Sequence, residues 1–162
     1  MESLTGEQVA KIHMKHYKKT SNKHLGELLI ERGAISREQL EKTVQRQKDK
    51  GGLIGEILVD LKFATEEDIA QALTCQYGFP YLPLSNYEIE PDVLKAVPQN
   101  VCKQFCLIPI DKIGKSLTLA MSDPLNVHAI EDVELITGCS VQTFVSTATD
   151  IRNSIVKCYP NK

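Results

Sequence analysis

The sequence predicts an α+β protein in which an all-helical lobe of two tandem helical hairpins precedes a small α/β lobe with a short sheet covered by helices. Three observations predict this fold: an internal repeat early in the chain, capping signals within each repeat, and strand-like runs that appear only after residue 105. The expected divisions are a basic N-terminal segment (1–23), the repeat lobe (24–79), the sheet lobe (80–159) and a tail (160–162).

The repeat has a step of 29 residues, which is the distance from position 25 to position 54. The run LGELL at 25–29 returns as IGEIL at 54–58, and SREQL at 36–40 returns as TEEDI at 65–69. Apolar residues at helical spacing predict a first short helix in each unit, and Gly33 predicts its end in the first unit. Each unit is therefore expected to form two short helices.

Capping pairs mark the start of the second helix in both units. Ser36 with Gln39 three residues later forms a capping box, and Thr65 with Asp68 occupies the equivalent positions. A polar linker at 48–52 separates the units. The face expected to be buried in these second helices consists of Leu40, Val44 and Gln47 in the first unit, and Ile69, Leu73 and Gln76 in the second.

The sheet lobe is expected to contain both helices and strands. Pro91 near a helix start, Gly138 near a helix end and the pair Thr147 and Asp150 are typical boundary signals. A turn at 111–115 between two apolar runs predicts a hairpin. The expected strands are 106–110, 116–121 and 140–145, and the expected helices are 91–97, 98–105, 124–136 and 148–158.

Composition favours a folded cytosolic protein. The chain is 42% hydrophobic and 25% charged, and its net charge of −2 gives no general attraction to nucleic acid. No apolar run approaches the roughly 20 residues that span a bilayer, and the first residues lack a signal-peptide pattern. The irregularly spaced cysteines are expected to be buried, reduced thiols: Cys75, Cys102, Cys106, Cys139 and Cys158.

Motifs that would indicate catalysis are missing or incomplete. Gly114-Lys115-Ser116 (114–116) has the ending of a phosphate-binding loop, but Pro109 stands where the first glycine belongs and a strand follows instead of a helix. His13 and His16 are spaced like metal ligands but have no acidic or cysteine partner nearby. We therefore predict a protein that is not an enzyme and holds no metal or cofactor.

The basic residues of 11–23 have two interpretations. They form either a solvated helix face or a contact surface for an anionic partner. Nucleic-acid binding is disfavoured by the low aromatic fraction of 6% and by the negative net charge.

The repeat units, together with the segment MSDPLN at 121–126 and LITG at 135–138, resemble the MshEN-type N-terminal domain of type II secretion and type IV pilus assembly ATPases. The resemblance covers about residues 24–158 and includes both repeat units and the five-residue spacer between them. It implies a regulatory or docking module that lacks the motor domain of those ATPases.

In one branch of that family the tandem repeat binds cyclic di-GMP through the motif RLGxxLxxxGxxxxxxLxxxLxxQ, present twice. The resemblance thus implies a cyclic di-GMP site, in which glycine permits close backbone approach and Gln supplies hydrogen bonds. The residues carried over are His24, Leu25, Gly26, Leu29, Gly33, Leu40, Val44 and Gln47 from the first unit, and Ile54, Gly55, Leu58, Ile69, Leu73 and Gln76 from the second.

The chain departs from the motif at three positions: His24 and Leu53 replace the two arginines, and Lys62 replaces the second glycine. Loss of an arginine removes a bidentate, permanently charged donor. The motif is therefore degenerate, and the alternative is a protein-docking domain that binds no nucleotide. We expect Gly26→Asp or Leu29→Asp to abolish any cyclic di-GMP binding while the fold survives.

The partners implied by the resemblance are the cytoplasmic part of an inner-membrane secretion or pilus platform protein, or a motor ATPase. The expected location is the cytoplasm, at the periphery of the inner membrane through such a partner, without direct membrane insertion.

Overall fold

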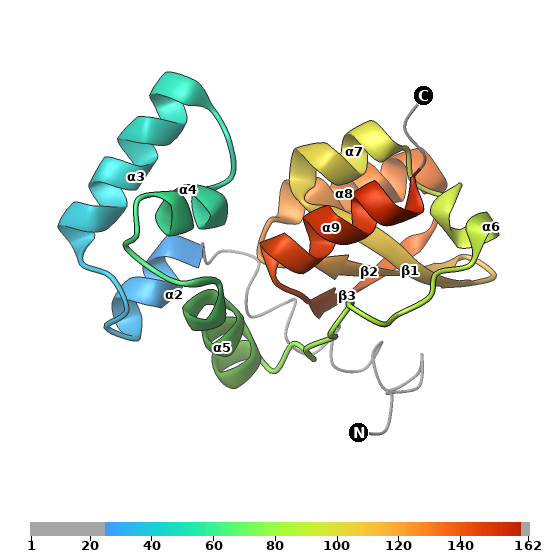
Figure 1. Cartoon of the computed structure of the whole chain (residues 1–162), viewed down its shortest axis with the longest axis horizontal. Coiled ribbons are helices and arrows are strands. Elements are labelled where there is room, and N and C mark those ends of the chain that lie inside the picture. The colour runs from blue at the N-terminus through green and yellow to red at the C-terminus, as the bar shows by residue number, and fades with distance from the viewer. Residues whose placement is uncertain (1–24, 160–162) are drawn as a thin grey trace.

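The computed structural model describes residues 25–159, which form eight helices and one three-stranded sheet. Figure 1 shows a lobe made only of helices beside a lobe that contains the sheet, so the predicted α+β class is confirmed. The helical lobe consists of α2 (Leu25–Glu31), α3 (Arg37–Lys50), α4 (Ile54–Asp60) and α5 (Glu66–Tyr77). The sheet lobe consists of α6 (Pro91–Leu94), α7 (Gln99–Phe105), β1 (Leu107–Ile113), β2 (Ser116–Met121), α8 (Val127–Thr137), β3 (Ser140–Val145) and α9 (Ala148–Cys158).

The two repeat units have the same local hydrogen bonds. The turn after α2 contains a bond from Ala34 N to Leu29 O, and the turn after α4 contains one from Phe63 N to Leu58 O, 29 residues later. Both capping boxes form as predicted, at Ser36 before α3 and at Thr65 before α5. The repeat in sequence is therefore a repeat in backbone structure.

The left-handed residue that ends the first helix of each unit is also repeated. Gly33 has φ of +77°, and Lys62 at the equivalent position has φ of +63°. A non-glycine residue in this region costs on the order of 1–2 kcal/mol, because its Cβ approaches the backbone. Lys62 thus adopts the glycine conformation of the motif without being glycine.

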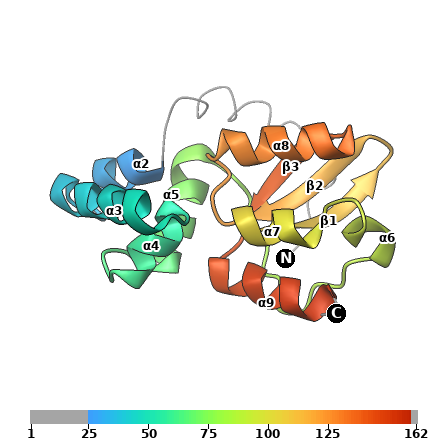
Figure 2. The same cartoon turned by 90° about the horizontal axis from the view of Figure 1, so that it is seen from above.

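The sheet has the order β1-β2-β3, with an antiparallel and a parallel pair. β1 and β2 form the predicted hairpin, and β2 and β3 run parallel with Ser116 opposite Ser140 and Met121 opposite Val145. α8 is the crossover between them, since parallel neighbours require a long connection. Figure 2 separates α8 from the pair α7 and α9, with the strands drawn between them.

Several predicted boundaries were wrong by a few residues. β1 continues through Asp111–Ile113 after a register shift at Pro109, so the hairpin turn is confined to Gly114 and Lys115. α8 begins at Val127 instead of 124. Before it, the Asp123 carboxylate accepts a hydrogen bond from the Leu125 amide, and the Asn126 side chain caps the helix by accepting one from the Ala129 amide. α3 extends through residues 48–50, which were expected to be linker, and α6 ends at 94 instead of 97.

Two apolar clusters fill the lobes. One lies among α7, α8, α9 and the strands, and includes the fully buried Leu117 and Met121. The other lies among the four repeat helices, and it also takes in Phe79, Leu125 and Val145 from outside the repeats. Apolar packing therefore joins the two lobes where α5 meets β3.

The cysteines are all reduced, but the prediction that all are buried was wrong. Cys102, Cys106 and Cys139 are buried, Cys158 is half-buried and Cys75 is exposed. Cys75 follows Leu73 by two positions on α5, which turns it away from the buried face. No helix within residues 25–159 has the length and apolar character needed to cross a membrane.

Candidate functional site

A cavity with a volume of about 710 Å³ lies between the two lobes. That size is in the range of small-molecule sites in proteins. The helical lobe supplies one wall, from the starts of α2 and α4 and from parts of α3 and α5. The sheet lobe supplies the other, from the loop after β2, the start of α8 and the start of α9. We call this cavity the interlobe cleft.

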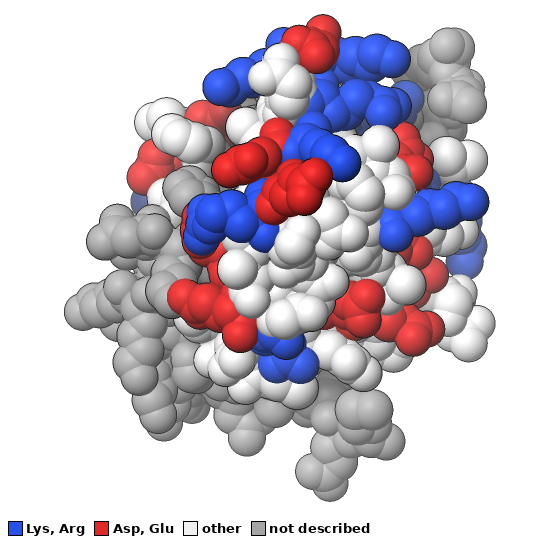
Figure 3. Space-filling model, turned by 90° about the vertical axis from the view of Figure 1, so that its left-hand side faces the viewer, with Lys and Arg blue, Asp and Glu red and all other residues white. Residues whose placement is uncertain are grey.

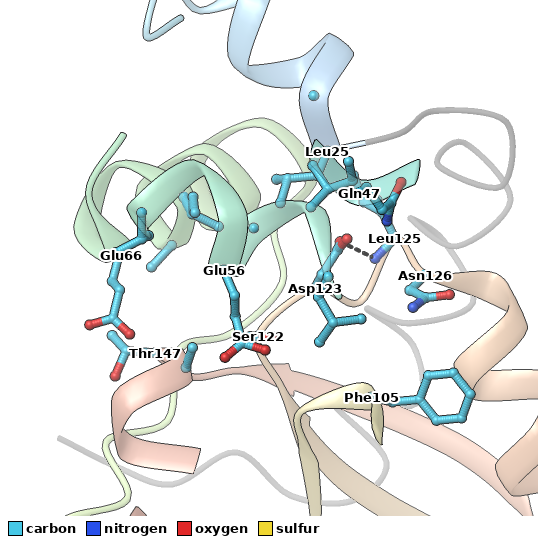
Figure 4. Close-up of a pocket in the computed structure, with 18 of the residues that line it drawn as sticks. Leu25, Gln47, Glu56, Glu66, Phe105, Ser122, Asp123, Leu125, Asn126 and Thr147 are labelled. Atoms are coloured by element: carbon cyan, nitrogen blue, oxygen red, sulfur yellow. Dashed lines mark hydrogen bonds between the residues drawn. The ribbon is translucent and has the colours of Figure 1, made fainter. Parts of the chain in front are cut away.

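Eight of the residues carried over from the motif line the interlobe cleft: Leu25, Gly26, Leu40, Val44, Gln47, Ile54, Gly55 and Ile69. The segment MSDPLN faces the same space, because Ser122, Asp123, Leu125 and Asn126 also line it. Figure 4 shows Leu25 and Gln47 on the helical side of the cleft, and Asp123 and Asn126 on the sheet side. Two motifs far apart in the sequence therefore meet at one cavity.

The other carried-over residues lie elsewhere. Leu29, Leu58 and Leu73 are fully buried within the helical lobe, where they form its core. Gly33 and Gln76 are exposed and do not line the cleft. His24 lies outside the described residues. Leu29→Asp would place a carboxylate in this apolar core, so the structure argues against the expectation that the fold survives this change.

The motif glycines bring helices close together. A Cβ on Gly26 would lie 2.4 Å from Leu40 Cδ1, and a Cβ on Gly55 would lie 3.3 Å from Leu25 Cδ2. Gly26 and Leu40 both line the cleft, so a larger residue at 26 would push the Leu40 side chain. These glycines serve helix packing in the free protein as well as the shape of the cleft.

The cleft combines apolar walls with fixed polar groups. Gln47 Nε2 donates to the Gly52 carbonyl at 2.9 Å, which orients its amide at the rim. Asp123 accepts a hydrogen bond from the Leu125 amide at 3.0 Å, shown as a dashed line in Figure 4. The side chains of Ser122, Asn126 and Thr147 add further hydrogen-bonding groups.

The charge of the cleft is acidic. Five carboxylate side chains line it, whereas no Lys or Arg does so among the residues 25–159; the five are Glu27, Glu56, Glu66, Asp123 and Glu131. Two of them are engaged across the cleft: Glu56 pairs with Arg152, and Glu66 accepts hydrogen bonds from Thr149. An anionic ligand would need cations that the described lining does not supply.

Several lining residues were missed by sequence reasoning. Phe105, His128, Glu131 and the segment 146–148 come from the sheet lobe, and no sequence motif marks them as a binding site. Asn126 had a signal, since an Asn three residues before Ala129 is a typical helix N-cap. The others reach the cleft only because the lobes pack together.

The buried thiols are poor nucleophiles. Burial raises the pKa of the Cys102 and Cys106 thiols to about 11, so both are protonated at neutral pH. Within residues 25–159, no group of three or more His, Cys, Asp and Glu side chains is arranged to hold a metal ion.

The outer face of the helical lobe carries both signs of charge. Figure 3 shows basic side chains gathered at the top of this face, with acidic side chains among and below them. The last turn of α3 holds Lys48 and Lys50, which complement the helix dipole.

The fold corresponds to that of a known domain family. The MshEN domain model matches residues 77–162, and the chain belongs to the MshEN domain family. The family named from the sequence is thereby confirmed; the matched range begins at Tyr77, the last residue of α5.

Curated relatives come from pilus assembly. The type IV pilus assembly ATPase PilB of Myxococcus xanthus is 36% identical over 138 residues, which is 85% of this chain and 24% of that protein. PilB of Thermus thermophilus is 30% identical over 141 residues, which is 86% of this chain and 16% of that protein. The chain thus spans about a quarter or less of the length of these relatives.

Solved structures share the fold. A structure of MshE with cyclic di-GMP has a TM-score of 0.63 and 27% identity, and covers 85% of this chain and all of that one. The N-terminal domain of XpsE has a TM-score of 0.66 and 23% identity, covers 99% of this chain and all of that one, and supports the fold alone.

Proposed function

We propose that the interlobe cleft binds cyclic di-GMP, and that the domain is a non-catalytic regulatory and docking module of a type IV pilus or type II secretion ATPase system. The observation that carries this proposal is the meeting of the repeat motif and the MSDPLN segment at one cleft. The structural similarity to MshE with cyclic di-GMP supports the same ligand.

The residues that line the cleft suit the bases of cyclic di-GMP better than its phosphates. Leu25, Ile54 and Ile69 offer apolar surface to the purine rings, and the amides of Gln47 and Asn126 offer hydrogen bonds to their edges. The two phosphates face a cleft whose described lining contains carboxylates and no Lys or Arg. Each missing charged hydrogen bond costs on the order of 1.5–3 kcal/mol, or roughly tenfold to a hundredfold in affinity. The expected affinity is accordingly low.

Leu53 gives the sharpest test of this site. It lines the cleft where the family motif has its second arginine, so Leu53→Arg restores a cation next to the ligand. The experiment is calorimetric titration of the native protein, of Leu53→Arg and of His24→Arg with cyclic di-GMP, with GTP and cyclic di-AMP as controls. We expect selective binding of cyclic di-GMP that tightens on the order of tenfold with each added arginine.

A control variant separates a local effect from a general gain of positive charge. Leu135 is 83% exposed and does not line the cleft, so Leu135→Arg adds the same charge elsewhere. Its affinity should equal that of the native protein. If neither the native protein nor Leu53→Arg binds cyclic di-GMP, the ligand proposal fails.

The acidic lining favours a second candidate function, which is protein docking without a nucleotide. The sheet lobe exposes the large apolar side chains of Ile113, Leu135, Ile136 and Val156. The proposed partners are the cytoplasmic part of an inner-membrane platform protein or a motor ATPase, which would place the domain in the cytoplasm at the periphery of the inner membrane. The test is binding of a purified partner domain to immobilised native protein and to Leu135→Asp; weaker binding by the variant is the expected result.

The sheet edges are less suited to docking than these side chains. α6 packs against β1, and Tyr87 Oη donates to the Ile110 carbonyl at 3.4 Å. On the other edge, the last residue of β3 bridges to Tyr81. Neither edge is open along its whole length, so strand addition is not the docking mode that we propose.

A further inference from the structure

Charged residues at equivalent positions of the two repeat units make different contacts. In the first unit they pair with each other, and in the second they contact the sheet lobe. In the first unit, Arg37 at the start of α3 pairs with Glu27 in α2, with 3.1 Å between Nη2 and Oε2. The positions 29 residues later are Glu56 and Glu66. Two carboxylates repel each other, so Glu56 and Glu66 cannot form the ion pair of the first unit.

Helix α9 of the sheet lobe supplies the donor for Glu56. Arg152 Nη2 lies 2.5 Å from Glu56 Oε1, and Arg152 Nε lies 3.3 Å from Oε2, which is a two-point contact. The same guanidinium also donates to the Lys103 carbonyl in α7. Both side chains are only 35% exposed. Arg152 therefore ties α4 of the helical lobe to two helices of the sheet lobe.

The first turn of α9 supplies the donors for Glu66. Thr149 N lies 2.7 Å from Glu66 Oε1, and Thr149 Oγ1 lies 2.9 Å from each carboxylate oxygen. The amide of Thr149 is one of those that a helix leaves without an internal partner, and the helix dipole favours a carboxylate there. Figure 4 shows the carboxylates of Glu56 and Glu66 directed toward the sheet lobe, near Ser122 and Thr147.

We propose that Glu56, Glu66, Thr149 and Arg152 form a latch, the α9 latch, that sets the opening of the interlobe cleft. The apolar contact of α5 with β3 keeps the lobes joined, and the latch adds polar contacts from α4 and the start of α5 to α9 that resist a change in the angle between the lobes. In the first unit, the equivalent Glu27 and Arg37 are paired within the unit.

The latch also regulates binding at the cleft, and this part rests on the proposed function. Glu56 and Glu66 line the cleft, so a ligand that contacts both lobes requires the arrangement that the latch holds. Ligand binding and latch closure then stabilise each other to the same extent.

The test exchanges the charge patterns of the two units, which are Glu27–Arg37 in the first and Glu56–Glu66 in the second. Glu66→Arg gives the second unit the Glu–Arg pair of the first unit, which draws Glu56 away from Arg152 and leaves Thr149 without its acceptor. The matched control, Arg37→Glu, gives the first unit the two-glutamate pattern of the second. A second variant, Arg152→Gln, removes the cation from the sheet lobe. All are made in a Cys75→Ser, Cys158→Ser background, because these two thiols are not fully buried.

Interlobe distances are measured by pulsed electron paramagnetic resonance between spin labels at Lys42→Cys in α3 and Lys112→Cys in β1, both of which are exposed. Circular dichroism first selects the variants that fold. We expect Glu66→Arg and Arg152→Gln to broaden the distance distribution and shift it to longer distances, and Arg37→Glu to leave it unchanged. A native distribution in any folded variant of the α9 latch would overturn the proposal, and so would an equal change in Arg37→Glu.

Measuring the same distances with cyclic di-GMP present keeps the latch proposal distinguishable from the ligand proposal. Saturating cyclic di-GMP should return the broadened distribution of Arg152→Gln toward the native one. If calorimetry finds no binding to the native protein or to Leu53→Arg, the ligand proposal fails while the ligand-free distances still decide the latch.

Discussion

The two repeat units share one backbone and differ in what they contact. Both contain two helices, the same turn hydrogen bonds and the same capping box. The first unit pairs Glu27 with Arg37 inside itself, whereas the second directs Glu56 and Glu66 to α9. At these positions the units differ at one place, where Arg37 of the first unit is replaced by Glu66 in the second, and this difference accompanies the contact of the second unit with the neighbouring lobe.

Local structure is copied with the sequence because its determinants lie within a few residues. Ser36 and Thr65 reach an amide three residues away, and the turns at Gly33 and Lys62 close within one helical turn. The contacts with α9 are not copied, because they depend on which unit lies beside the sheet lobe. The predictions below test how far this equivalence of the two units extends.

The largest effects are expected in the shared core. Leu29 and Leu58 are equivalent and fully buried, so Leu29→Ala and Leu58→Ala should each lower the free energy of unfolding by about 2–5 kcal/mol. Denaturant unfolding measures this, with the exposed Leu135→Ala as a control that should change stability by less than about 0.5 kcal/mol. A small loss at only one of the two leucines would show that the units are not packed alike.

Substitution of the equivalent motif glycines, Gly26 and Gly55, should change the free energy of unfolding by different amounts. Gly26→Ala places a methyl group 2.4 Å from Leu40 Cδ1, and we expect it to lower the free energy of unfolding by up to about 2 kcal/mol. Gly55→Ala meets Leu25 at 3.3 Å, and the gain in helix propensity of about 1 kcal/mol should offset that contact. Adding Leu40→Ala to Gly26→Ala should remove the clash; failure of this rescue would point to a different cause.

The two helix caps should be equal in strength. Ser36→Ala and Thr65→Ala each remove one side-chain acceptor from a capping box, at a cost of about 1 kcal/mol in the free energy of unfolding. Thermal and denaturant unfolding of the two variants check this, with the exposed loop variant Ser85→Ala as a neutral control. A cost at Thr65 well above that at Ser36 would mean that the cap of α5 also supports the contact with the sheet lobe.

The smallest effects are expected at the left-handed turns. Gly33→Ala should lower the free energy of unfolding by about 1 kcal/mol, since nothing crowds the site and only the backbone is strained. Lys62→Gly should raise it by about 0.5 kcal/mol, because relief of strain exceeds the entropy that glycine adds to the unfolded chain. If Lys62→Gly destabilises the protein, a side-chain contact of Lys62 must outweigh the strain.

Sequence reasoning was most accurate where a signal was local. The bounds of β2, β3 and α9 match the prediction, as do both capping boxes. The loop at 123–126 was taken for helix, because the bond from the Leu125 amide to Asp123 competes with the helical pattern. The extension of β1 through Ile113 depends on pairing with β2 across a register shift, which the β1 sequence alone does not encode.

The candidate site was foreseen only on its helical side. Leu25, Gly26 and Gln47 could be placed by the motif, whereas Phe105, Glu131 and Thr147 come from segments with no common pattern. Leu29, Leu58 and Leu73 belong to the same motif and yet form the core, since a helical period alone does not distinguish a face toward a cleft from a face toward another helix.

The sequence by itself determined the repeat, the helices within it and the family to which the chain belongs, because short-range hydrogen bonds and apolar periodicity are encoded in neighbouring residues. Only the tertiary structure decided that the second unit lies beside α9, that Arg152 pairs with Glu56, and that the repeat and the MSDPLN segment share one cleft. Those contacts join residues up to 96 positions apart, and their geometry follows from the packing of two apolar cores against each other.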